Sequence, residues 1–250
     1  MAKSKYEYVK KFEEKDFCLP NCWIVIRIDG HNFHSFASKH SYKKPNDENA
    51  LNLMSQAAKD VMKEFRDIII SYGQSDEYSF VLKRSTTQFS RRKSKLVSNI
   101  VSLFTSAFVF NWQKYFQMKL ELLPSFDGRA VVYPSLENIR DYLSWRQADC
   151  HINNLYNTCF WALVQQGGLT NKEAEQRLKD TLSADKNEIL FSEFGMNYNN
   201  EPELFRKGTV MFWDFPEHDS DLRKRKAIKK QHIDIIGDQF WADHPNLLEK

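Results

Sequence analysis

Three acidic residues stand at the ends of two apolar segments that have the composition of β-strands. Asp29 follows the run 22–28, and Asp76 and Glu77 open the run 78–82. Carboxylates gathered at one sheet edge need a cation in order to stay ionised together. Oxygen ligands on a rigid edge suit Mg²⁺, which keeps several waters and takes substrate phosphates as further ligands. The pattern therefore predicts phosphoryl or nucleotidyl transfer.

The candidate metal ligands are the carboxylates of Asp29 and Asp76 and the carbonyl oxygen of Gly30, with Glu77 close by. Glycine at position 30 lets the backbone approach a phosphate, because no side chain stands in the way. Two metal ions at such a site would stabilise both the attacking and the leaving oxygen. Strand-end carboxylates that only cap turns explain the two acidic clusters equally well when these are taken alone.

The elements that must bring the acids together follow the order strand, helix, strand, strand, helix, strand. We expect strands at 22–28, 67–72, 77–83 and 127–133, and helices from Asn46 or Asp47 to Phe65 and over 90–116. This order is the split βαβ arrangement of ferredoxin-like domains, in which the first strand lies beside the hairpin. Asp29 and Asp76 are therefore expected to reach the same edge of the sheet.

The second half of the chain reads as mainly helical. One broken helix or two is expected over 137–166, a capping box at Thr170 and Glu173, a helix from Ser183 or Asp185 to Gly195, and a strand over 208–213. The charged stretch 214–231 reads as a solvated loop. The prediction is an α+β fold, with a palm-like catalytic domain at 1–135 and a helical C-terminal region at 136–250 packed on it.

Composition places the chain among folded proteins. Its 250 residues are 42% hydrophobic with 19 Phe, enough for a large core, and the net charge of +3 neither demands nor excludes a polyanionic partner. No apolar signal sequence or membrane span is apparent, so we expect an intracellular, cytoplasmic protein with no membrane partner and with reduced thiols. Cys18 with Cys22, and His31 with His34, have zinc-like spacing, but neither pair has an obvious partner pair.

Two segments favour a nucleotide. The polar loop from Gly30 to His34 comes directly after the first acid, and Arg91-Arg92-Lys93-Ser94-Lys95 occupies the expected start of a helix. The helix dipole disfavours each cation there by about 0.3–1 kcal/mol, so a polyphosphate is a natural counterpart. A solvated basic turn is an equally good explanation of the second segment. Lys43-Lys44 beside Pro45 is a similar but weaker case.

The segment 144–157 has an unusual density of amides for a helix. Trp145, Ala148 and Ile152, with Leu155 or Tyr156, are expected to form its buried stripe. The remaining polar face comprises Arg146, Gln147, Asp149, His151, Asn153, Asn154 and Asn157. Because Asn is a poor mid-helix residue, this face favours hydrogen bonding to bases or ribose. A weaker cluster of cations, amides and an aromatic combines 184–188 with 197–201.

Taken together these motifs resemble the tRNA(His) guanylyltransferase family. The residues that carry the resemblance are RIDG at 27–30, KPND at 44–47, GQSDEYSF at 73–80, YLSWRQADCHINN at 142–154 and DKNE at 185–188. The similarity runs from the N-terminus to about Trp213 and resumes at 234–238. The stretch 214–231 is shorter than expected for the family, which leaves any contact from this loop in doubt.

The resemblance implies a polymerase-type palm that works in the 3′-to-5′ direction and adds one guanosine to the 5′ end of tRNA(His). ATP would activate the 5′-monophosphate, the 3′-hydroxyl of GTP would displace AMP, and pyrophosphate would be removed last. It also implies two Mg²⁺ ions and a homotetramer. The catalytic residues would be Asp29, Asp76 and Glu77, with the metals on Asp29, Gly30 and Asp76.

The resemblance extends to the binding residues. The nucleotide site would comprise Asp29, Gly30, His31, Asn32, Phe33, His34, Lys44, Ser75, Asp76, Arg92 and Lys95. Contacts to tRNA or a role in guanylate addition would fall to His151, Asn153, Lys186 and Asn197. Two alternatives stay open, a palm-type nucleotide cyclase and a tRNA-binding protein without catalytic activity. The clustered acids argue against the second, since a pure binder gains nothing from acids near a polyanion.

Overall fold

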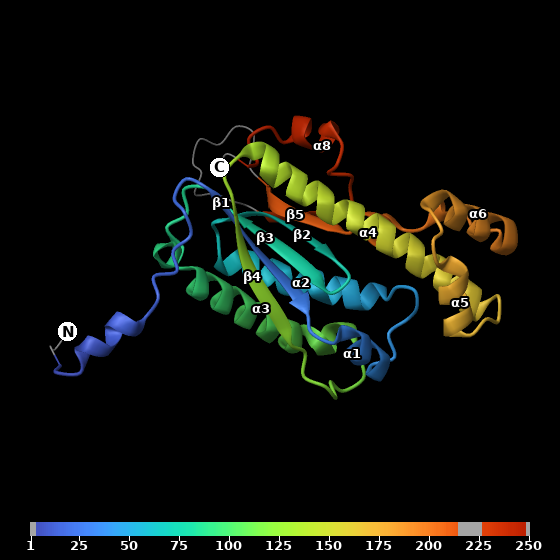
Figure 1. The fold of residues 1–250 in the computed structure, drawn as a ribbon, viewed down its shortest axis with the longest axis horizontal. Helices are drawn as coiled ribbons and strands as arrows, with labels where there is room; N and C mark the ends of the chain where they lie inside the picture. Colours follow the sequence, from blue (N-terminus) through green and yellow to red (C-terminus); the bar gives the residue numbers. More distant parts are fainter. Residues whose placement is uncertain (1–3, 215–226, 249–250) are drawn as a thin grey trace.

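The computed structural model describes residues 4–214 and 227–248 and is built on a six-stranded antiparallel sheet (Figure 1). The strand order is β4-β1-β3-β2-β5-β6. The strands are β1 (Trp23–Gly30), β2 (Ile68–Gln74), β3 (Glu77–Leu82), β4 (Phe126–Tyr133), β5 (Thr209–Asp214) and β6 (Ala227–Gln231). The helices are α1 (Phe33–Lys39), α2 (Glu48–Glu64), α3 (Lys93–Tyr115), α4 (Leu136–Gln165), α5 (Asn171–Leu178), α6 (Ser183–Phe194), α7 (Glu203–Lys207) and α8 (Asp238–Asp243), with short 3₁₀ turns η1 (Glu7–Phe12), η2 (Gln88–Arg91) and η3 (Tyr198–Asn200).

The four strands of the first half confirm the ferredoxin-like prediction. Their order, β4-β1-β3-β2, places β1 between β4 and the β2–β3 hairpin. The second half adds β5 and β6 beside β2, so it completes the sheet as well as covering it. The boundary expected between residues 135 and 136 falls where β4 ends and α4 begins.

The loop expected over 214–231 is wrong at its C-terminal end, because 227–231 form the edge strand β6. Its residues pair with β5 from Val210↔Gln231 to Asp214↔Ala227. Main-chain hydrogen bonds make this strand, and its two lysines stand on an exposed edge, as is common for edge strands. A polar edge strand has no apolar run, so periodicity does not reveal it. The rest of the expected loop, 215–226, lies outside the described residues.

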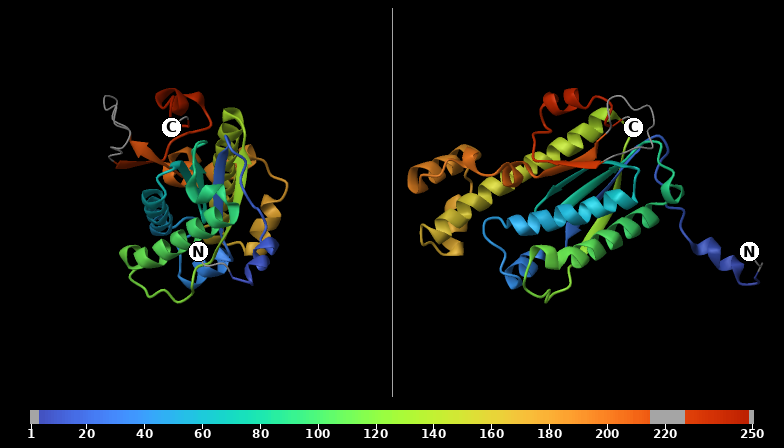
Figure 2. Two further views of the ribbon diagram at one scale, coloured as in Figure 1. Left: turned by 90° about the vertical axis from the view of Figure 1, so that its left-hand side faces the viewer. Right: turned by 180° about the vertical axis from the view of Figure 1, so that it is seen from behind.

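Alternation along β1 divides the core between the two faces of the sheet. Ile24, Ile26 and Ile28 face a core shared with α2 and α3, whereas Trp23 and Val25 face a core shared with α4 and α8. Seen from behind, α2 and α3 lie side by side over one face (Figure 2). A strand buried on both faces is rigid, and β1 delivers Asp29 from its C-terminal end.

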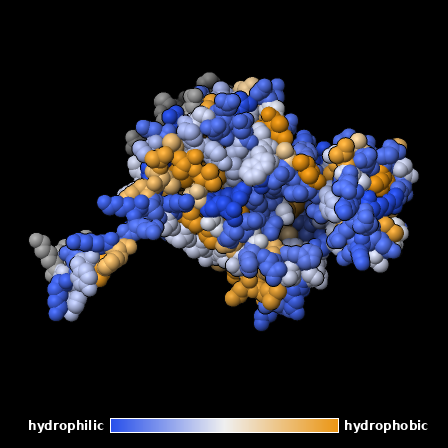
Figure 3. Space-filling model, viewed as in Figure 1, coloured by the Kyte–Doolittle hydropathy of each residue, from blue (hydrophilic) through white to orange (hydrophobic). Residues whose placement is uncertain are grey.

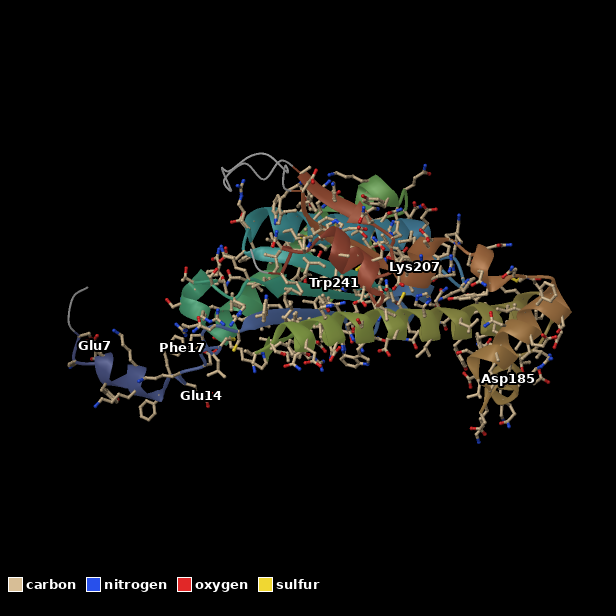
Figure 4. The ribbon with its side chains drawn as sticks, turned by 90° about the horizontal axis from the view of Figure 1, so that it is seen from above. Glu7, Glu14, Phe17, Asp185, Lys207 and Trp241 are labelled. Carbon is tan, nitrogen blue, oxygen red and sulfur yellow. The ribbon has the colours of Figure 1, made fainter. Side chains whose placement is uncertain are left out.

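The long helix α4 links the sheet to a separate helical cluster. It is a single continuous helix of 30 residues, capped by the Ser135 hydroxyl, which accepts a hydrogen bond from the Asn138 amide. Its second half extends beyond the sheet and carries α5 and α6, which pack on it through a third core (Figure 1). The capping box at Thr170 and Glu173 is present as predicted. Asp185 marks the far tip of this cluster in Figure 4.

The expected buried stripe of α4 is confirmed at Leu155, which is 5% exposed, but is wrong at Trp145 and Ile152, because polar side chains occupy part of the buried face. Trp145 and Ile152 are 51% and 59% exposed, whereas Arg146, Gln147 and Asn154 are all at most 6% exposed. These polar side chains are buried because each finds hydrogen-bonding partners in neighbouring segments. Three of the seven residues of the expected polar face therefore hold the protein together and are closed to an RNA.

The N-terminal segment leaves the body of the molecule. The turn η1 buries none of its residues, and Figure 4 shows Glu7 and Glu14 well away from the sheet. Hydrophobic side chains lie among hydrophilic ones along this extension (Figure 3), and Phe12 is 81% exposed. Within the described residues no helix has the length and apolar character needed to cross a bilayer.

Gln147 is predicted to be a stability determinant. Its Nε2 donates to the carbonyl oxygens of Lys207 and Ile233, both at 2.9 Å, and its Oε1 accepts from the Ile235 amide at 2.7 Å. Gln147→Leu would leave the Ile233 carbonyl oxygen and the Ile235 amide without a partner, whereas the Lys207 carbonyl oxygen keeps a hydrogen bond from the Tyr72 hydroxyl. The free energy of unfolding should therefore fall by about 2 kcal/mol in urea denaturation. Asp141→Asn, on the exposed side of the same helix, should change it by less than about 0.5 kcal/mol. Equal stability of the two variants would contradict this role.

Candidate active site

The acidic residues meet at one edge of the sheet, as predicted. Asp29 lies directly across from Glu77 in the β1–β3 pair, and the Gly30 amide donates to the Asp76 carbonyl oxygen at 3.1 Å. The turn between β2 and β3 is tight, with Ser75 at a φ of 48°. This edge therefore gathers three carboxylates from two adjacent strands.

The three carboxylates differ in how their charge is balanced. Glu77 accepts two hydrogen bonds from Arg146 Nη1, at 3.1 and 3.0 Å, and Arg27 Nε is 4.0 Å away. Among the described residues, no basic nitrogen lies within 4 Å of the carboxylate oxygens of Asp29 or Asp76. The pair Asp29 and Asp76 thus keeps an uncompensated charge, which is what a cation site requires.

Burial raises the pKa values of two of the three carboxyl groups, those of Asp76 and Glu77. Burial raises the pKa of Asp76 above its ordinary value, the hydrogen bond from Ser75 Oγ opposes this, and the charge of Asp29 adds to the rise. Burial also raises the pKa of Glu77, although Arg146 opposes it. Both shifts show that this edge disfavours extra negative charge unless a cation is supplied.

Gly30 is required by space at this edge. A Cβ atom on Gly30 would stand 2.3 Å from Phe33 Cδ2 and 2.9 Å from Asp76 Oδ2. The carboxylate of Asp76 therefore lies against bare backbone. Two side-chain carboxylates and a nearby backbone carbonyl suit Mg²⁺, which fills its other positions with water and phosphate oxygens. The described residues contain no group of three or more His, Cys, Asp or Glu side chains that could hold a metal.

Two cavities open onto this edge. The acidic cavity, of about 420 Å³, is lined by Asp29, Asp76, Glu77 and, from α4, Asn153 and Asn154. The loop cavity, of about 740 Å³, lies between α1, the 40–47 loop and the second half of α4. Ser75 and Asp76 line both cavities, so Asp76 stands where they meet, whereas Asp29 and Glu77 line the acidic cavity alone. Their sizes are in the range of small-ligand sites.

The residues expected to bind the nucleotide divide into liners and supports. His34, Lys44 and Ser75 line the loop cavity. Phe33 also lines this cavity, and because it is buried with its ring stacked on Phe36 at 4.9 Å, it supports the cavity from the core as well.

His31 and Asn32 belong to the turn that leads into α1. The His31 amide donates to the Ser125 carbonyl at 2.8 Å. Asn32 begins α1 in the left-handed conformation, with a φ of 54°. These two residues shape the loop after the first acid.

Arg92 and Lys95 are not brought to the acids within one chain. Arg92 forms an isolated β-bridge with Phe17, and its Nε lies 3.8 Å from Asp16 Oδ1. Both partners precede the start of β1, whereas Asp29 is near the end of that strand. Chain direction explains this, because β3 starts at the acidic edge and runs away from it, so α3 must begin at the opposite end. The topology predicted from the sequence contained this signal.

Arg91, part of the same basic turn, has a structural role that sequence reasoning missed. Its guanidinium donates to the carbonyl oxygens of Cys18, Leu19, Cys22, Arg84 and Thr86. It thereby ties the segment before β1 to the segment after β3. The polyphosphate interpretation does not apply to this residue.

The residues expected to contact tRNA are also divided. His151 and Asn197 line an α4–α6 cavity of about 560 Å³, and Asn153 lines the acidic cavity. Lys186 is only 8% exposed, and its Nζ donates to the carbonyl and hydroxyl oxygens of Thr181 at 2.7 and 2.8 Å. Its ammonium group is enclosed in the α5–α6 connection and does not face a ligand.

Sequence reasoning missed Arg146 as a partner of the acids. Arg146 is 4% exposed and forms ion pairs with Glu77 and Asp149. Its Cζ lies 3.5 Å from the centre of the Trp145 ring. The signal was the Arg146–Asp149 spacing, which puts an opposite charge one helical turn away. Asn46 was likewise missed; it donates to Asn154 Oδ1 at 2.9 Å.

Comparison with known proteins decides the family. A family model described as tRNAHis guanylyltransferase matches residues 6–134, and one described as Thg1 C terminal domain matches 137–237. The chain belongs to the tRNA(His) guanylyltransferase family. A probable tRNA(His) guanylyltransferase from Bos taurus is 55% identical, covering all of this chain and 90% of the relative. The tRNA(His) guanylyltransferase of Schizosaccharomyces pombe is also 55% identical, covering 99% and 98%.

Solved structures agree with this family assignment. The crystal structure of the Saccharomyces cerevisiae family member has a TM-score of 0.79 at 54% identity, over 82% of this chain and 92% of that chain. A bacterial Thg1-like protein in complex with ATP has a TM-score of 0.78 over 98% and 99%, and at 21% identity it supports the fold alone. The predicted family, the palm-type α+β fold and the nucleotidyltransferase class are confirmed.

Asp76→Asn is predicted to stabilise the chain in the absence of metal. A carboxyl group whose pKa is raised on folding lowers stability once the pH exceeds its unfolded value, because the folded state resists losing the proton. The amide should therefore raise the free energy of unfolding by about 1 kcal/mol at pH 7, and the gain should disappear below pH 3.8. Urea unfolding in EDTA across this pH range measures both. A gain that grows as the pH falls would contradict the assignment.

Proposed function

We propose that the protein adds one guanosine to the 5′ end of tRNA(His), with Asp29 and Asp76 holding two Mg²⁺ ions and the Gly30 carbonyl as a third ligand. The observation that carries this is the uncompensated Asp29–Asp76 pair in the acidic cavity, with Asp76 also lining the adjoining loop cavity. Bound Mg²⁺ would neutralise the charge that develops on the reacting phosphate oxygens. Family membership supports the substrate, since the named relatives are tRNA(His) guanylyltransferases.

The reaction we propose has three steps. The 5′-monophosphate of the tRNA attacks the α-phosphorus of ATP and releases pyrophosphate. The 3′-hydroxyl of GTP then attacks the activated 5′-phosphorus and releases AMP. Water finally attacks the α-phosphorus of the added nucleotide and releases pyrophosphate, which leaves a 5′-monophosphate. Bacterial Thg1-like proteins have been solved with ATP and with GTP, which supports binding of both nucleotides by this fold.

The residues of this chain would divide the work by position. Lys44, with His34 and Ser75, would contact a triphosphate in the loop cavity, since these residues line it. We propose Glu77 as the third catalytic residue. Because its charge is paired with Arg146, it would position the ends of β1 and β3, while the metals lie on Asp29 and Asp76. The turn containing His31, Asn32 and Phe33 would hold the polar loop after Asp29 against the nucleotide.

The RNA would lie over α4. Asn153 in the acidic cavity and His151 and Asn197 in the α4–α6 cavity would contact the tRNA. Lys186 would act indirectly, because its hydrogen bonds support the start of α6 at the border of that cavity. The region 136–250 would thus contribute to tRNA binding.

A homotetramer is part of this proposal. Arg92 and Lys95 lie at the far end of the sheet from Asp29, so they can reach a triphosphate at the acidic edge only from a second copy of the chain. We further propose a cytoplasmic location. Neither point is needed for the chemistry of the acidic edge itself.

Asp29→Ala and Asp76→Ala should each lower guanylate transfer by at least about 10³-fold, because each removes a metal ligand. The assay follows labelled ATP and GTP with 5′-monophosphorylated tRNA(His), and the affinity for tRNA should stay within about twofold. Asp127→Ala is the matched control, since Asp127 lies across from Asp29 but is exposed and paired with Arg129 at 3.2 Å. Turnover retained in either acid variant would refute the metal assignment. A cyclic nucleotide formed without tRNA would favour the cyclase alternative.

Mg²⁺ should stabilise the wild-type chain and not the Asp76→Asn variant. A ligand that binds only the folded state raises its stability by about 2.7 kcal/mol at a hundredfold excess over the dissociation constant. Differential scanning fluorimetry with MgCl₂, reversed by EDTA, measures the shift in melting temperature. The same shift in both proteins would place the ion elsewhere.

A further inference from the structure

The loop that carries Lys44 is held from one face of α4. Asn46 Nδ2 donates to Asn154 Oδ1 at 2.9 Å, and Lys44 Nζ lies 5.7 Å from the centre of the Trp161 ring. Asn154 and Trp161 are seven residues apart, which places them on the same face of a helix, two turns from each other. The tip of the loop therefore has two supports, and both come from α4.

Asn154 uses both ends of its amide. It is 6% exposed, its Oδ1 accepts from Asn46, and its Nδ2 donates to the Tyr198 hydroxyl at 2.9 Å. A buried amide with both groups satisfied is fixed in one orientation, because any rotation leaves a polar atom unpaired. Asn46, Asn154 and Tyr198 thus form an ordered chain of hydrogen-bonded side chains, called the relay below, which is centred on α4.

The two ends of this relay stand in different cavities. Asn46 lines the acidic cavity and the loop cavity, whereas Tyr198 lines the α4–α6 cavity together with His151 and Asn197. Asn154 itself lines the acidic cavity. A change at Tyr198 therefore reaches the Lys44 loop through two hydrogen bonds.

We propose that Asn154 is a positioning residue that keeps the Lys44 loop in its nucleotide-binding conformation and couples it to the pocket around Tyr198. Without Asn154, Asn46 loses its partner on α4, and the loop can move Lys44 away from Ser75 and Asp76. This inference rests on the proposed nucleotide role of the loop cavity. It adds a route by which the state of the α4–α6 cavity sets the affinity for ATP.

ATP binding to the full-length chain, measured by calorimetry without RNA, tests the relay. Asn46→Ala and Asn154→Ala should each weaken ATP binding about tenfold, the size expected for one buried hydrogen bond. The double variant should be no weaker than either single one, because both remove the same contact. Tyr198→Phe should weaken ATP binding about threefold, although Tyr198 does not line the loop cavity. In the transfer assay Asn154→Ala should raise KM for ATP and leave kcat nearly unchanged.

Thr158→Val is the matched control for simple destabilisation. Thr158 is 2% exposed on α4, and its hydroxyl donates to the Asn154 carbonyl at 2.8 Å, outside the relay. This variant should lower the melting temperature and keep the ATP affinity of the wild type. Wild-type ATP affinity in Asn154→Ala, or additive losses in the double variant, would overturn the inference alone. A wild-type chain that does not bind ATP would overturn the proposed function as well.

Discussion

The structure depends on an imbalance of charge at the β1–β3 edge. Three carboxylates lie there, yet among the described residues only Glu77 has cationic partners, the buried Arg146 and, at 4.0 Å, Arg27. Asp29 and Asp76 are left with repulsion that the fold does not relieve by itself. Such a site persists only because β1 is packed on both faces and cannot move its end away. The rigidity of the sheet is thus what makes the edge a cation site.

Polar burial on α4 connects this edge to the rest of the molecule. Arg146 holds Glu77, Gln147 holds the segments around Lys207 and Ile233, and Asn154 holds the nucleotide loop and η3. These hydrogen bonds fix the orientation of each side chain, because a rotation would leave buried polar atoms without partners. Hydrophobic packing supplies the bulk of the core, while these contacts specify how α4 sits on the sheet.

Local signals in the sequence were enough for the four strands and two helices of the first half and for the meeting of the acids, but not for the short helices α1, α7 and α8. The apolar run of β1, the hairpin of β2 and β3 and the capping box at Thr170 depend on neighbouring residues alone. The burial of Arg146, Gln147 and Asn154 on α4 was not predicted, because distant partners bury these side chains and no local pattern records them. The strand β6 was missed because main-chain pairing at a polar edge leaves no hydrophobic signature. The distance of Arg92 from the acids could have been predicted from the topology, since β3 carries the chain away from Asp29 before α3 begins.

The polar face of α4 also limits how its length can change. One inserted or deleted residue turns everything beyond it by about 100° around the helix axis. An apolar interface can accommodate such a rotation by repacking. The hydrogen bonds of Gln147 and Asn154 cannot, because each is made to one particular backbone or amide group. Length variation should therefore be tolerated in exposed connections such as the one around Gly167 and Gly168, and not between residues 146 and 161.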